Sequence, residues 1–356
     1  MSKSTRDRSN ILVIGGAGFI GSNLAHGLLA DGYHVTVFDN LSRPGVERNL
    51  DWLRRDAGDR LHFIRGDIRD AAAVSTAVSD VTAVYHLAAQ TAVTTSLEDP
   101  RDDFSINAQG TLNVLEAMRR TGRKVPVIFS STNKVYGSLG DMAVREQDGR
   151  YLPADAHLRA HGIGEDRPLD FCTPYGCSKG VADQYVLDYA TSYGLPTAVL
   201  RMSCIYGPRQ FGTEDQGWVA HFLIAALKGQ PINVYGDGKQ VRDILFVDDA
   251  IAAYRAVLAN IGTVAGRAFN LGGGPGNDVS VNQVLAEIAR VTGRDLDIAR
   301  GPWRQGDQHY FVADTRRLQN ELGWQPRTDW RSGIARLLDW LVQERVATRA
   351  TQRAVA

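Results

Sequence analysis

Tyr175 and Lys179 are the residues whose types and spacing most directly suggest chemistry. They stand four residues apart at the start of an expected helix, so the phenol and the ammonium lie on one helix face. A tyrosine with a reference pKa of about 10 is a poor base at neutral pH, but a neighbouring cation favours the phenolate and lowers that pKa. A phenolate can remove a proton from a hydroxyl while a hydride leaves the same carbon. The pair therefore predicts oxidation or reduction at a hydroxyl-bearing carbon.

Thr132 supplies a third candidate catalytic group. It follows Ser130 and Ser131, just beyond an expected strand that ends at Phe129, and we expect it to donate a hydrogen bond to the same substrate oxygen. Taken alone, a Tyr-x-x-x-Lys pattern occurs in many helices, and a threonine hydroxyl often only caps a turn. The catalytic interpretation depends on a second motif nearer the N-terminus.

That motif is a glycine-rich loop between a buried strand and a helix. Residues 11–14 are apolar, residues 22–30 have apolar side chains at helical period, and Gly15, Gly18 and Gly21 lie between them at three-residue spacing. Because these glycines have no side chain, backbone amides and the helix dipole can meet a pyrophosphate directly. The context of strand, loop and helix predicts a dinucleotide site.

Asp39 indicates which dinucleotide binds. It ends the second apolar run, His34–Phe38, about twenty residues after the loop, where a carboxylate can accept hydrogen bonds from both ribose hydroxyls. The same carboxylate would repel a 2′-phosphate. We therefore predict NAD, with NADP as the alternative because Arg43 follows closely.

The elements that position these residues alternate between short strands and longer helices, which is typical of a doubly wound parallel Rossmann sheet. Ligands bind beyond the carboxyl ends of such strands. The clearest helices are expected at Asp103–Arg120, with Gly122 as C-cap and Phe104 on its apolar face, and at Tyr175–Tyr193, ended by Gly194. The expected strands are Ile11–Ile14, His34–Phe38, Leu61–Arg65, Ala83–Leu87, Val125–Phe129 and Thr197–Leu200.

The chain length of 356 residues fits two lobes. We expect residues 1–200 to form the dinucleotide-binding domain, with 240–272 returning to it, and residues 201–345 to form a smaller C-terminal α/β lobe that binds substrate. Periodicity fails between 137 and 171, and this insertion is interpreted as a partial lid over the substrate. Residues 346–356 have little to bury, so we expect a frayed tail.

Composition excludes several classes of protein. Lys plus Arg and Asp plus Glu both number 40, so there is no basic surface that suggests nucleic acid. No apolar run is long enough to span a membrane, and the first ten residues carry no apolar signal, so we expect a cytoplasmic protein without a membrane partner. The three cysteines lack the spacing of a disulfide framework or a zinc site, and we expect no metal.

The chain resembles the extended short-chain dehydrogenase/reductase family of nucleotide-sugar epimerases and dehydratases over nearly its whole length. The resemblance rests on residues 15–21, 66–68, 86–89, 107–111, 135–137, 175–179, 206–208 and 242–243. It implies that Asp67 and Ile68 flank the adenine and that Asn107 braces the site. The residues it implies at the cofactor are Gly15, Gly18, Phe19, Ile20, Gly21, Asp39, Asn40, Asp67, Ile68, Leu87, Ala88, Ala89, Asn107, Tyr175 and Lys179.

More specific stretches resemble one group within that family. They are residues 130–137, 174–180, 182–185, 209–211 and 215–218. This resemblance implies inversion at C2 of a CDP-linked 3,6-dideoxyhexose. It implies oxidation to a 2-keto sugar by bound NAD, reorientation of the flat intermediate and return of the hydride to its other face. Because no net redox change occurs, NAD would be retained.

Two departures from related enzymes bear on the reaction. The 4,6-dehydratases of the family carry Thr-Asp-Glu where this chain has Thr132, Asn133 and Lys134. Loss of water needs an acid and a base, and neither replacement is a carboxyl group, so dehydration is disfavoured. Many 4-epimerases place Asn where this chain has Cys204, a weak hydrogen-bonding group that suits a deoxygenated sugar.

The substrate is expected between the lobes, where guanidinium groups can pair with a diphosphate. Arg242 is the strongest candidate, Arg304 could instead be a solvated surface cation, and Trp218 could stack on a base or simply pack. The candidate substrate-binding residues are Asn133, Lys134, Cys204, Arg209, Gln210, Trp218, Arg242 and Arg304.

Two alternative functions are also consistent with the sequence, and an oligomeric state is expected. A UDP-sugar 4-epimerase or another redox-neutral nucleotide-sugar enzyme would share these motifs. A catalytically silent NAD-binding regulator or scaffold is a different class, although the presence of both Tyr175 and Lys179 argues against it. Relatives of this kind pair through the two long helices, so we expect a homodimer or a homotetramer.

Overall fold

A seven-stranded parallel sheet forms the centre of the larger lobe. Its strands are β1 (Asn10–Ile14), β2 (His34–Asp39), β3 (Leu61–Arg65), β4 (Ala83–His86), β5 (Val127–Thr132), β8 (Thr197–Met202) and β12 (Arg267–Leu271). Their order is β12-β8-β5-β4-β1-β2-β3, with every pairing parallel. The computed structural model of the protein describes residues 9–355, excluding the side chains of residues 56 and 345–355. The predicted doubly wound Rossmann sheet is confirmed, since strand order reverses direction at β1.

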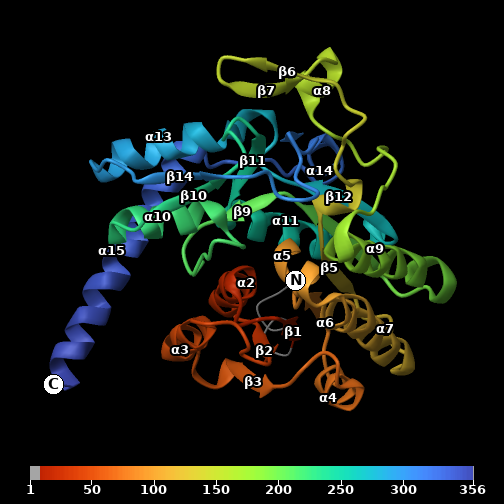
Figure 1. Cartoon of the computed structure of the whole chain (residues 1–356). Helices are drawn as coiled ribbons and strands as arrows, with labels where there is room; N and C mark the ends of the chain where they lie inside the picture. The colour runs from red at the N-terminus through yellow and green to blue at the C-terminus, as the bar shows by residue number, and fades with distance from the viewer. Residues whose placement is uncertain (1–8, 356) are drawn as a thin grey trace.

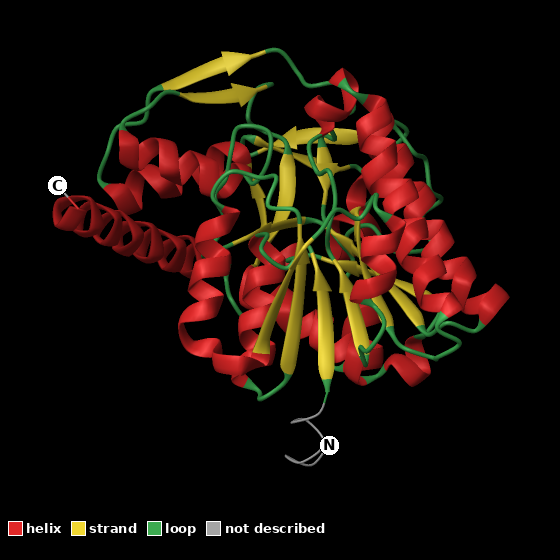
Figure 2. Cartoon of the chain, turned by 90° about the horizontal axis from the view of Figure 1, so that it is seen from below, coloured by secondary structure: helices red, strands yellow, loops and turns green. Residues whose placement is uncertain are grey.

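Helices cover both faces of this sheet (Figure 2). Neighbouring residues of a strand point to opposite faces, so Ile11 and Val13 join one core while Leu12 and Ile14 join the other. The first face packs against α2 (Phe19–Ala30), α3 (Val46–Ala57), α11 (Val247–Ala259), α12 (Ile261–Val264) and α14 (Arg316–Leu322). The second packs against α4 (Ala71–Ala77), α7 (Gly110–Arg120) and α9 (Thr173–Tyr193).

The smaller lobe is built on short strands from the second half of the chain. A four-stranded sheet contains β9 (Cys204–Tyr206), β11 (Val241–Phe246), β13 (Asp278–Ser280) and β15 (Tyr310–Phe311), and a parallel pair contains β10 (Ile232–Tyr235) and β14 (Ile298–Gly301). Its helices are α10 (Trp218–Lys228), α13 (Val281–Thr292) and α15 (Trp330–Val355). Of the expected returning segment 240–272, β11 therefore belongs to the small sheet, and α11 with β12 joins the large one.

The shorter elements connect these layers. They are α5 (Val93–Glu98), α6 (Pro100–Phe104), α8 (Ala156–His161), β6 (Val144–Gln147), β7 (Arg150–Pro153), the 3-10 turns η1 (Gly58–Arg60), η3 (Asn133–Tyr136) and η4 (Pro275–Asn277), and the π-helical turn η2 (Ser105–Gln109).

The helix expected at Asp103–Arg120 is not uniform. It consists of α6, the π turn η2 and α7 in succession. A π turn contains an additional residue, so it rotates the side chains before it relative to those after it. Phe104, which we expected on the apolar face, is consequently 54% exposed, whereas Leu115 and Met118 of α7 are buried. That part of the helix prediction was wrong.

The insertion between 137 and 171 is ordered, but it does not line the main cavity. It contains the hairpin β6/β7 and helix α8, which lie against the small lobe at the top of Figure 1. Tyr151 donates to Asp237 at 2.7 Å, Lys239 donates to Glu146 at 2.7 Å, and Arg150 pairs with Asp278. No periodicity is recognisable here because each of the two strands is only four residues long. Its place in the fold does not support the lid interpretation.

The C-terminal segment is helical rather than frayed. Helix α15 continues to Val355 and projects from the body of the molecule (Figure 1). Alanine, arginine and glutamine favour helix strongly, which accounts for the difference from our expectation. Among the described residues, no helix combines the length and apolarity needed to cross a membrane.

Candidate active site

One cavity of about 510 Å³ lies beyond the carboxyl ends of the large sheet's strands. It extends from the glycine loop to the start of α9. The expected cofactor residues that line it are Gly15, Gly18, Phe19, Ile20, Gly21, Asp39, Asn40, Asp67, Ile68, Leu87, Ala88, Ala89, Tyr175 and Lys179. The structure thus brings the glycine loop and the tyrosine–lysine pair, 160 residues apart in sequence, to a single site.

The glycine loop fits a pyrophosphate. Gly15 has a φ of +78°, and a Cβ added there would lie 2.6 Å from the backbone nitrogen of Ala88. A Cβ on Gly21 would collide with the carbonyl oxygen of Gly15. Gly18 is the N-cap of α2 and has no side chain that could cap the helix. The backbone N–H groups of the first turn therefore face the cavity without a side-chain acceptor from Gly18. An anion at this helix start would be held by those amides.

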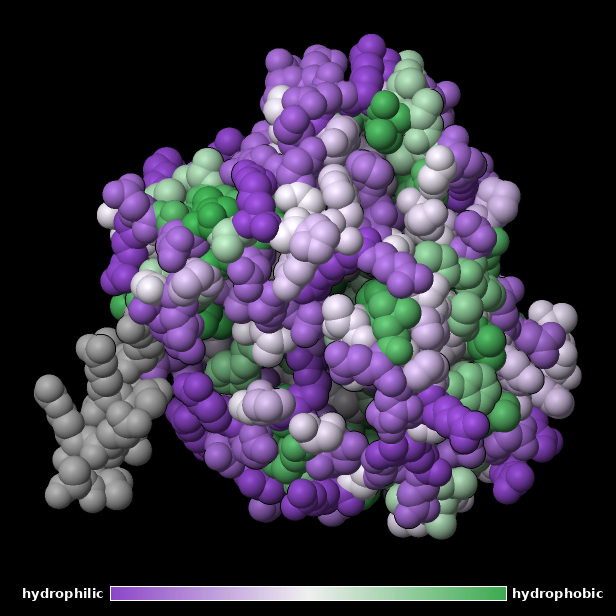
Figure 3. Space-filling view, in the orientation of Figure 1, coloured by the Kyte–Doolittle hydropathy of each residue, from purple (hydrophilic) through white to green (hydrophobic). Residues whose placement is uncertain are grey.

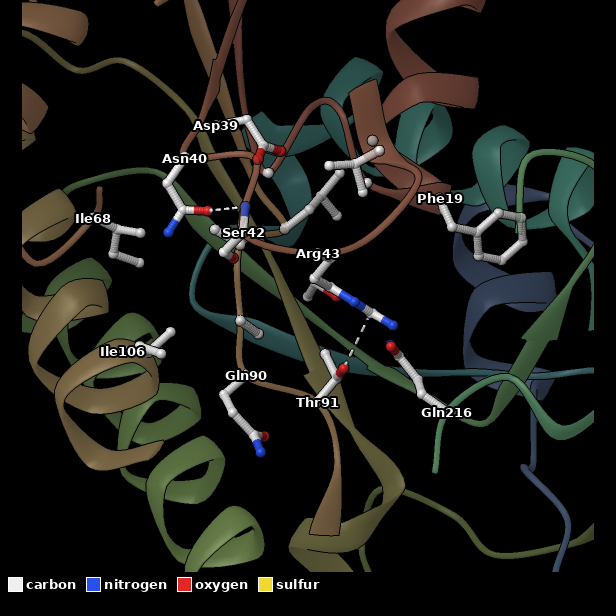
Figure 4. A pocket seen from close by; sticks show the side chains of 18 of the residues that line it. Phe19, Asp39, Asn40, Ser42, Arg43, Ile68, Gln90, Thr91, Ile106 and Gln216 are labelled. Atoms are coloured by element: carbon white, nitrogen blue, oxygen red, sulfur yellow. Dashed lines mark hydrogen bonds between the residues drawn. The ribbon is translucent and has the colours of Figure 1, made fainter. Parts of the chain in front are cut away.

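Asp39, the residue that we expect to bind the ribose, lines the cavity at the end of β2 (Figure 4). Its carboxylate oxygens accept from the backbone N–H groups of Ala17 at 3.0 Å and Leu41 at 2.9 Å. Burial raises the pKa of Asp39, while these backbone donors and Arg43 oppose that rise. The carboxylate is thus fixed in orientation at the end of β2.

The residues that we expect to flank the adenine form a chain of polar contacts. Asn40 donates to Asp67 at 3.0 Å. It also accepts from the backbone N–H of Ser42, as Figure 4 shows. Arg69 pairs with Asp67 at 2.8 Å and thereby lowers the pKa of that carboxyl group. Ile68 is buried beside these groups and supplies an apolar wall.

Three loops meet across the cavity at Arg43, which kept NADP as the alternative cofactor, and at Thr91 and Gln216, which were not among the predicted binding residues. Arg43 donates to the Thr91 hydroxyl at 3.4 Å, and Gln216 lies opposite them (Figure 4). The buried Oε1 atom of Gln216 has no hydrogen-bond partner within the described chain. These loops follow β2, β4 and β9, so only the fold brings them together.

Tyr175 and Thr132 lie together at the inner end of the site. The threonine hydroxyl lies beside the phenol and donates to the Asn133 amide oxygen at 3.3 Å, and Tyr175 is 8% exposed. Burial raises the pKa of Tyr175 to about 12, and the Thr132 contact opposes this rise. The lowered pKa that we expected from the spacing to Lys179 is therefore not a property of the chain by itself, because desolvation of the phenol is the larger effect.

Lys179 is buried beneath the same cavity. Its ammonium donates to the carbonyl oxygen of Ser130 at 2.6 Å and lies 4.2 Å from the centre of the Phe129 ring. Burial lowers the pKa of Lys179 to about 7, while Asp183 and Asp103 raise it. The pKa of Lys179 thus lies near neutral pH.

The π turn explains how Asn107 braces this region. Its side chain accepts from the backbone N–H of Gln90 at 3.0 Å and donates to the Gln90 carbonyl, Asp103 and Ser178, each at 3.1 Å. Ser178, next to Lys179 in sequence, donates to Asp103 at 2.5 Å. Asn107 is buried and does not line the cavity, so its place is that of a brace.

The candidate substrate residues that follow Thr132 face the small lobe. Asn133 donates to Gln308 at 3.2 Å, and Gln308 donates to the carbonyl oxygen of Gly137 at 2.7 Å. Lys134 lies 3.7 Å from Asp307, which also pairs with Arg242 at 2.6 Å. Asp307 and Gln308 were missed in the sequence, although the polar run from Arg304 to Gln308 was the available signal.

Cys204, Trp218 and Arg304 lie farther along the small lobe. The Trp218 indole donates to the Cys204 sulfur at 3.4 Å, and burial raises the pKa of that thiol. Arg304 lies over the Tyr235 ring at 4.0 Å and pairs with Asp215 at 3.1 Å.

The side chains of Arg209 and Gln210 point away from the cluster of Cys204, Trp218 and Arg304. Arg209, with a φ of +71°, places its guanidinium 4.2 Å from the Trp52 ring and pairs with Glu344 at 3.3 Å. Gln210 donates to the carbonyl oxygen of Ile205 at 3.2 Å. Both line a smaller cavity of about 50 Å³ that shares Gly18, Arg43 and Gln216 with the main cavity. Substrate contact by either residue stays a prediction.

The parallel sheet, the glycine loop and the tyrosine–lysine pair define a dinucleotide-dependent enzyme of the short-chain dehydrogenase/reductase type. The chain belongs to the NAD dependent epimerase/dehydratase family, whose model matches residues 11–272. The predicted cofactor, NAD, is confirmed on this basis, as is the assignment of the chain as an NAD-dependent nucleotide-sugar epimerase.

Individual relatives share nearly the whole length of the chain. CDP-paratose 2-epimerase of Salmonella typhi is 42% identical over 337 residues, covering 93% of this chain and 98% of that protein. UDP-glucose 4-epimerase of Mycolicibacterium smegmatis is 34% identical, covering 92% and 97%.

Solved structures agree with the fold. UDP-glucose 4-epimerase from Thermotoga maritima with UDP-glucose has a TM-score of 0.79 at 32% identity, covering 94% of this chain and 99% of that one. dTDP-glucose 4,6-dehydratase from Streptomyces venezuelae with NAD bound has a TM-score of 0.81 at 30% identity, covering 94% and 98%.

Proposed function

We propose that this enzyme inverts C2 of a CDP-linked 3,6-dideoxyhexose, converting CDP-paratose into CDP-tyvelose. The observation that carries the proposal is the 42% identity to a CDP-paratose 2-epimerase over almost the full length of both chains. The residues after Thr132 support it, because Asn133 and Lys134 provide neither carboxyl group that a dehydration needs.

Tyr175 is proposed as the base that removes the proton from the C2 hydroxyl, with Thr132 donating a hydrogen bond to the same oxygen. The closeness of the two groups supports these roles, because a hydroxyl beside the phenol also lies within reach of the oxygen that the phenol deprotonates. When bound, NAD accepts the hydride and later returns it. Tyr175 then gives back its proton to the inverted sugar.

Lys179 is proposed to hold the nicotinamide ribose and to supply positive charge beside the phenol. Its position in the cavity wall supports this role, and ribose oxygens that accept from its ammonium would oppose the desolvation that lowers the pKa of Lys179. A more cationic Lys179 favours the Tyr175 phenolate. The charge on Lys179 then lowers the pKa of Tyr175, whereas burial alone raises it.

The test is incubation of purified protein with CDP-paratose, with the sugar followed by proton NMR. We expect conversion to tyvelose without added reductant or oxidant. A parallel incubation with UDP-glucose tests the 4-epimerase alternative, which the 34% identical relative favours. Inversion of UDP-glucose at C4 with no change in CDP-paratose would overturn the proposal.

A homodimer formed through α5, α6 and α9 is proposed as the assembly. Large apolar side chains are exposed on these helices, namely Leu97, Phe104, Tyr185 and Tyr193. Figure 3 shows apolar surface on the right-hand side of the molecule, where α7 and α9 lie. Apolar surface of this kind marks association sites more often than it marks free surface.

A further inference from the structure

Lys134 is the charged side chain closest in sequence to the candidate catalytic threonine, and no role in the reaction described above uses it. Its backbone N–H donates to the Thr132 hydroxyl at 3.2 Å. Its ammonium lies on the other side, donating to the carbonyl oxygen of Gly306 at 3.2 Å. Lys134 therefore connects the reacting end of the site to the small lobe.

The ammonium is poorly compensated for a charge in this environment. It lies 3.7 Å from Asp307, but the same carboxylate makes a closer contact, 2.6 Å, with Arg242. Two cations thus share one carboxylate. Burial lowers the pKa of Lys134, and Arg242 adds to that effect.

The remaining neighbours of Lys134 are neutral or engaged elsewhere. Asn133 and Gln308 bind each other, and Cys204 is held by Trp218 with a pKa that burial raises. Among the described residues around the ammonium, Asp307 is the carboxylate that opposes its charge. The two cations Lys134 and Arg242 share one carboxylate, so a bound anion would balance the remaining positive charge.

The structure of a nucleotide sugar indicates which anionic group would balance this charge. In a nucleotide sugar the diphosphate is attached to C1, and C2 is bonded directly to C1, whereas C4 lies across the ring. An enzyme that reacts at C2 must therefore hold the sugar-side phosphate close to Thr132 and Tyr175. A 4-epimerase holds the same phosphate a ring's width farther away.

We propose that Lys134, together with Arg242, binds the sugar-side phosphate of the substrate and thereby places C2, rather than C4, beside Thr132 and Tyr175. Lys134 is then a specificity-determining residue for the position of inversion. This inference rests on the proposed C2 reaction.

The test compares the binding of CDP and CMP by calorimetry to the NAD-loaded protein and to Lys134→Met. CMP lacks the sugar-side phosphate. We expect Lys134→Met to weaken CDP binding about tenfold or more, because a charge-assisted hydrogen bond is lost, and to leave CMP binding unchanged. Lys134→Arg should restore most of the CDP affinity. Lys239→Met is the matched control, because Lys239 is also ion-paired in the small lobe but pairs with exposed Glu146.

Equal loss of CDP and CMP binding, or unchanged binding of both, would overturn the inference. The same comparison with UDP and UMP separates it from the proposed function. If the unmodified enzyme binds UDP and not CDP, the cytidine substrate is wrong, while the effect of Lys134→Met on UDP against UMP still decides the phosphate contact. A variant that binds CMP normally is also folded, so loss of CDP binding cannot result from unfolding.

Discussion

At the scale of single residues, burial sets the chemistry of the site. It raises the pKa of Tyr175 to about 12 and lowers that of Lys179 to about 7, so neither group carries full charge at neutral pH in the chain by itself. Both shifts have the same cause, since the charged form of each group loses hydration in the closed site. Contacts with bound cofactor and substrate must therefore lower the pKa of Tyr175 and raise that of Lys179.

Replacing Tyr175 by Phe should remove the base and keep the fold. We expect kcat for CDP-paratose to fall about 10²–10⁴-fold, the range of general acid–base catalysis, with NAD still bound. Turnover by NMR and the NAD content of the purified variant are the measurements. Undiminished turnover would exclude Tyr175 as the base.

Replacing Lys179 by Met should stabilise the protein, most of all at low pH. A lysine whose folded pKa is depressed to about 7 disfavours folding fully below pH 7, and the cost disappears as pH rises toward its ordinary value of 10.5. Loss of the 2.6 Å bond to Ser130 opposes part of this gain. The Tm difference between Lys179→Met and the unmodified protein should therefore be more positive at pH 6 than at pH 10. The opposite trend would show that Asp183 and Asp103 outweigh burial and raise the pKa of Lys179 in the folded protein.

At the scale of elements, local patterns located residues that line the main cavity but not the long-range contacts. The glycine loop and the ends of β2, β3 and β4 are short-range features, and their residues line one cavity. Asp307 and Gln308 lie more than 170 residues from Thr132, and no period links them to it. The π turn was missed because a helix pattern does not reveal one inserted residue, and the reach of Arg209 depends on a positive φ that sequence does not show.

Gly21→Ala tests the loop directly. A Cβ at this position collides with the Gly15 carbonyl oxygen, so the loop must open and the first turn of α2 must move. We expect loss of bound NAD, measured by release of nucleotide on denaturation. Gly262→Ala is the matched control, because a Cβ there meets nothing within 4 Å. Equal NAD content in both variants would contradict the account of the loop.

At the scale of the whole molecule, the chain forms a large lobe around the seven-stranded sheet and a smaller lobe of short strands. The parallel sheet and its helix layers were predictable because hydrophobic periodicity and glycine punctuation agree along the first 200 residues, whereas the strand order and the last strand, β12, were not predicted. The small lobe was less predictable because its strands, such as β15, are as short as two residues and pair across long distances in the chain. The positions of Lys134 and Arg242 around Asp307 follow from that long-range pairing.

The assembly is also a property at this scale. Light scattering should give the mass of a homodimer, or of a dimer of such dimers. Phe104→Lys combined with Tyr185→Lys should shift the protein toward monomer, because both positions are exposed in the single chain and only an interface would bury the new charges. A monomer mass for the unmodified protein would rule out the proposed interface.

The central claim is that one hydride leaves C2 and returns to the opposite face of the same carbon. CDP-paratose carrying deuterium at C2 tests it most directly, with the enzyme working in ordinary water and the product examined by NMR and mass spectrometry. The account predicts tyvelose that keeps the deuterium at C2. Inversion with deuterium lost to the solvent, or no inversion at that carbon, would contradict it.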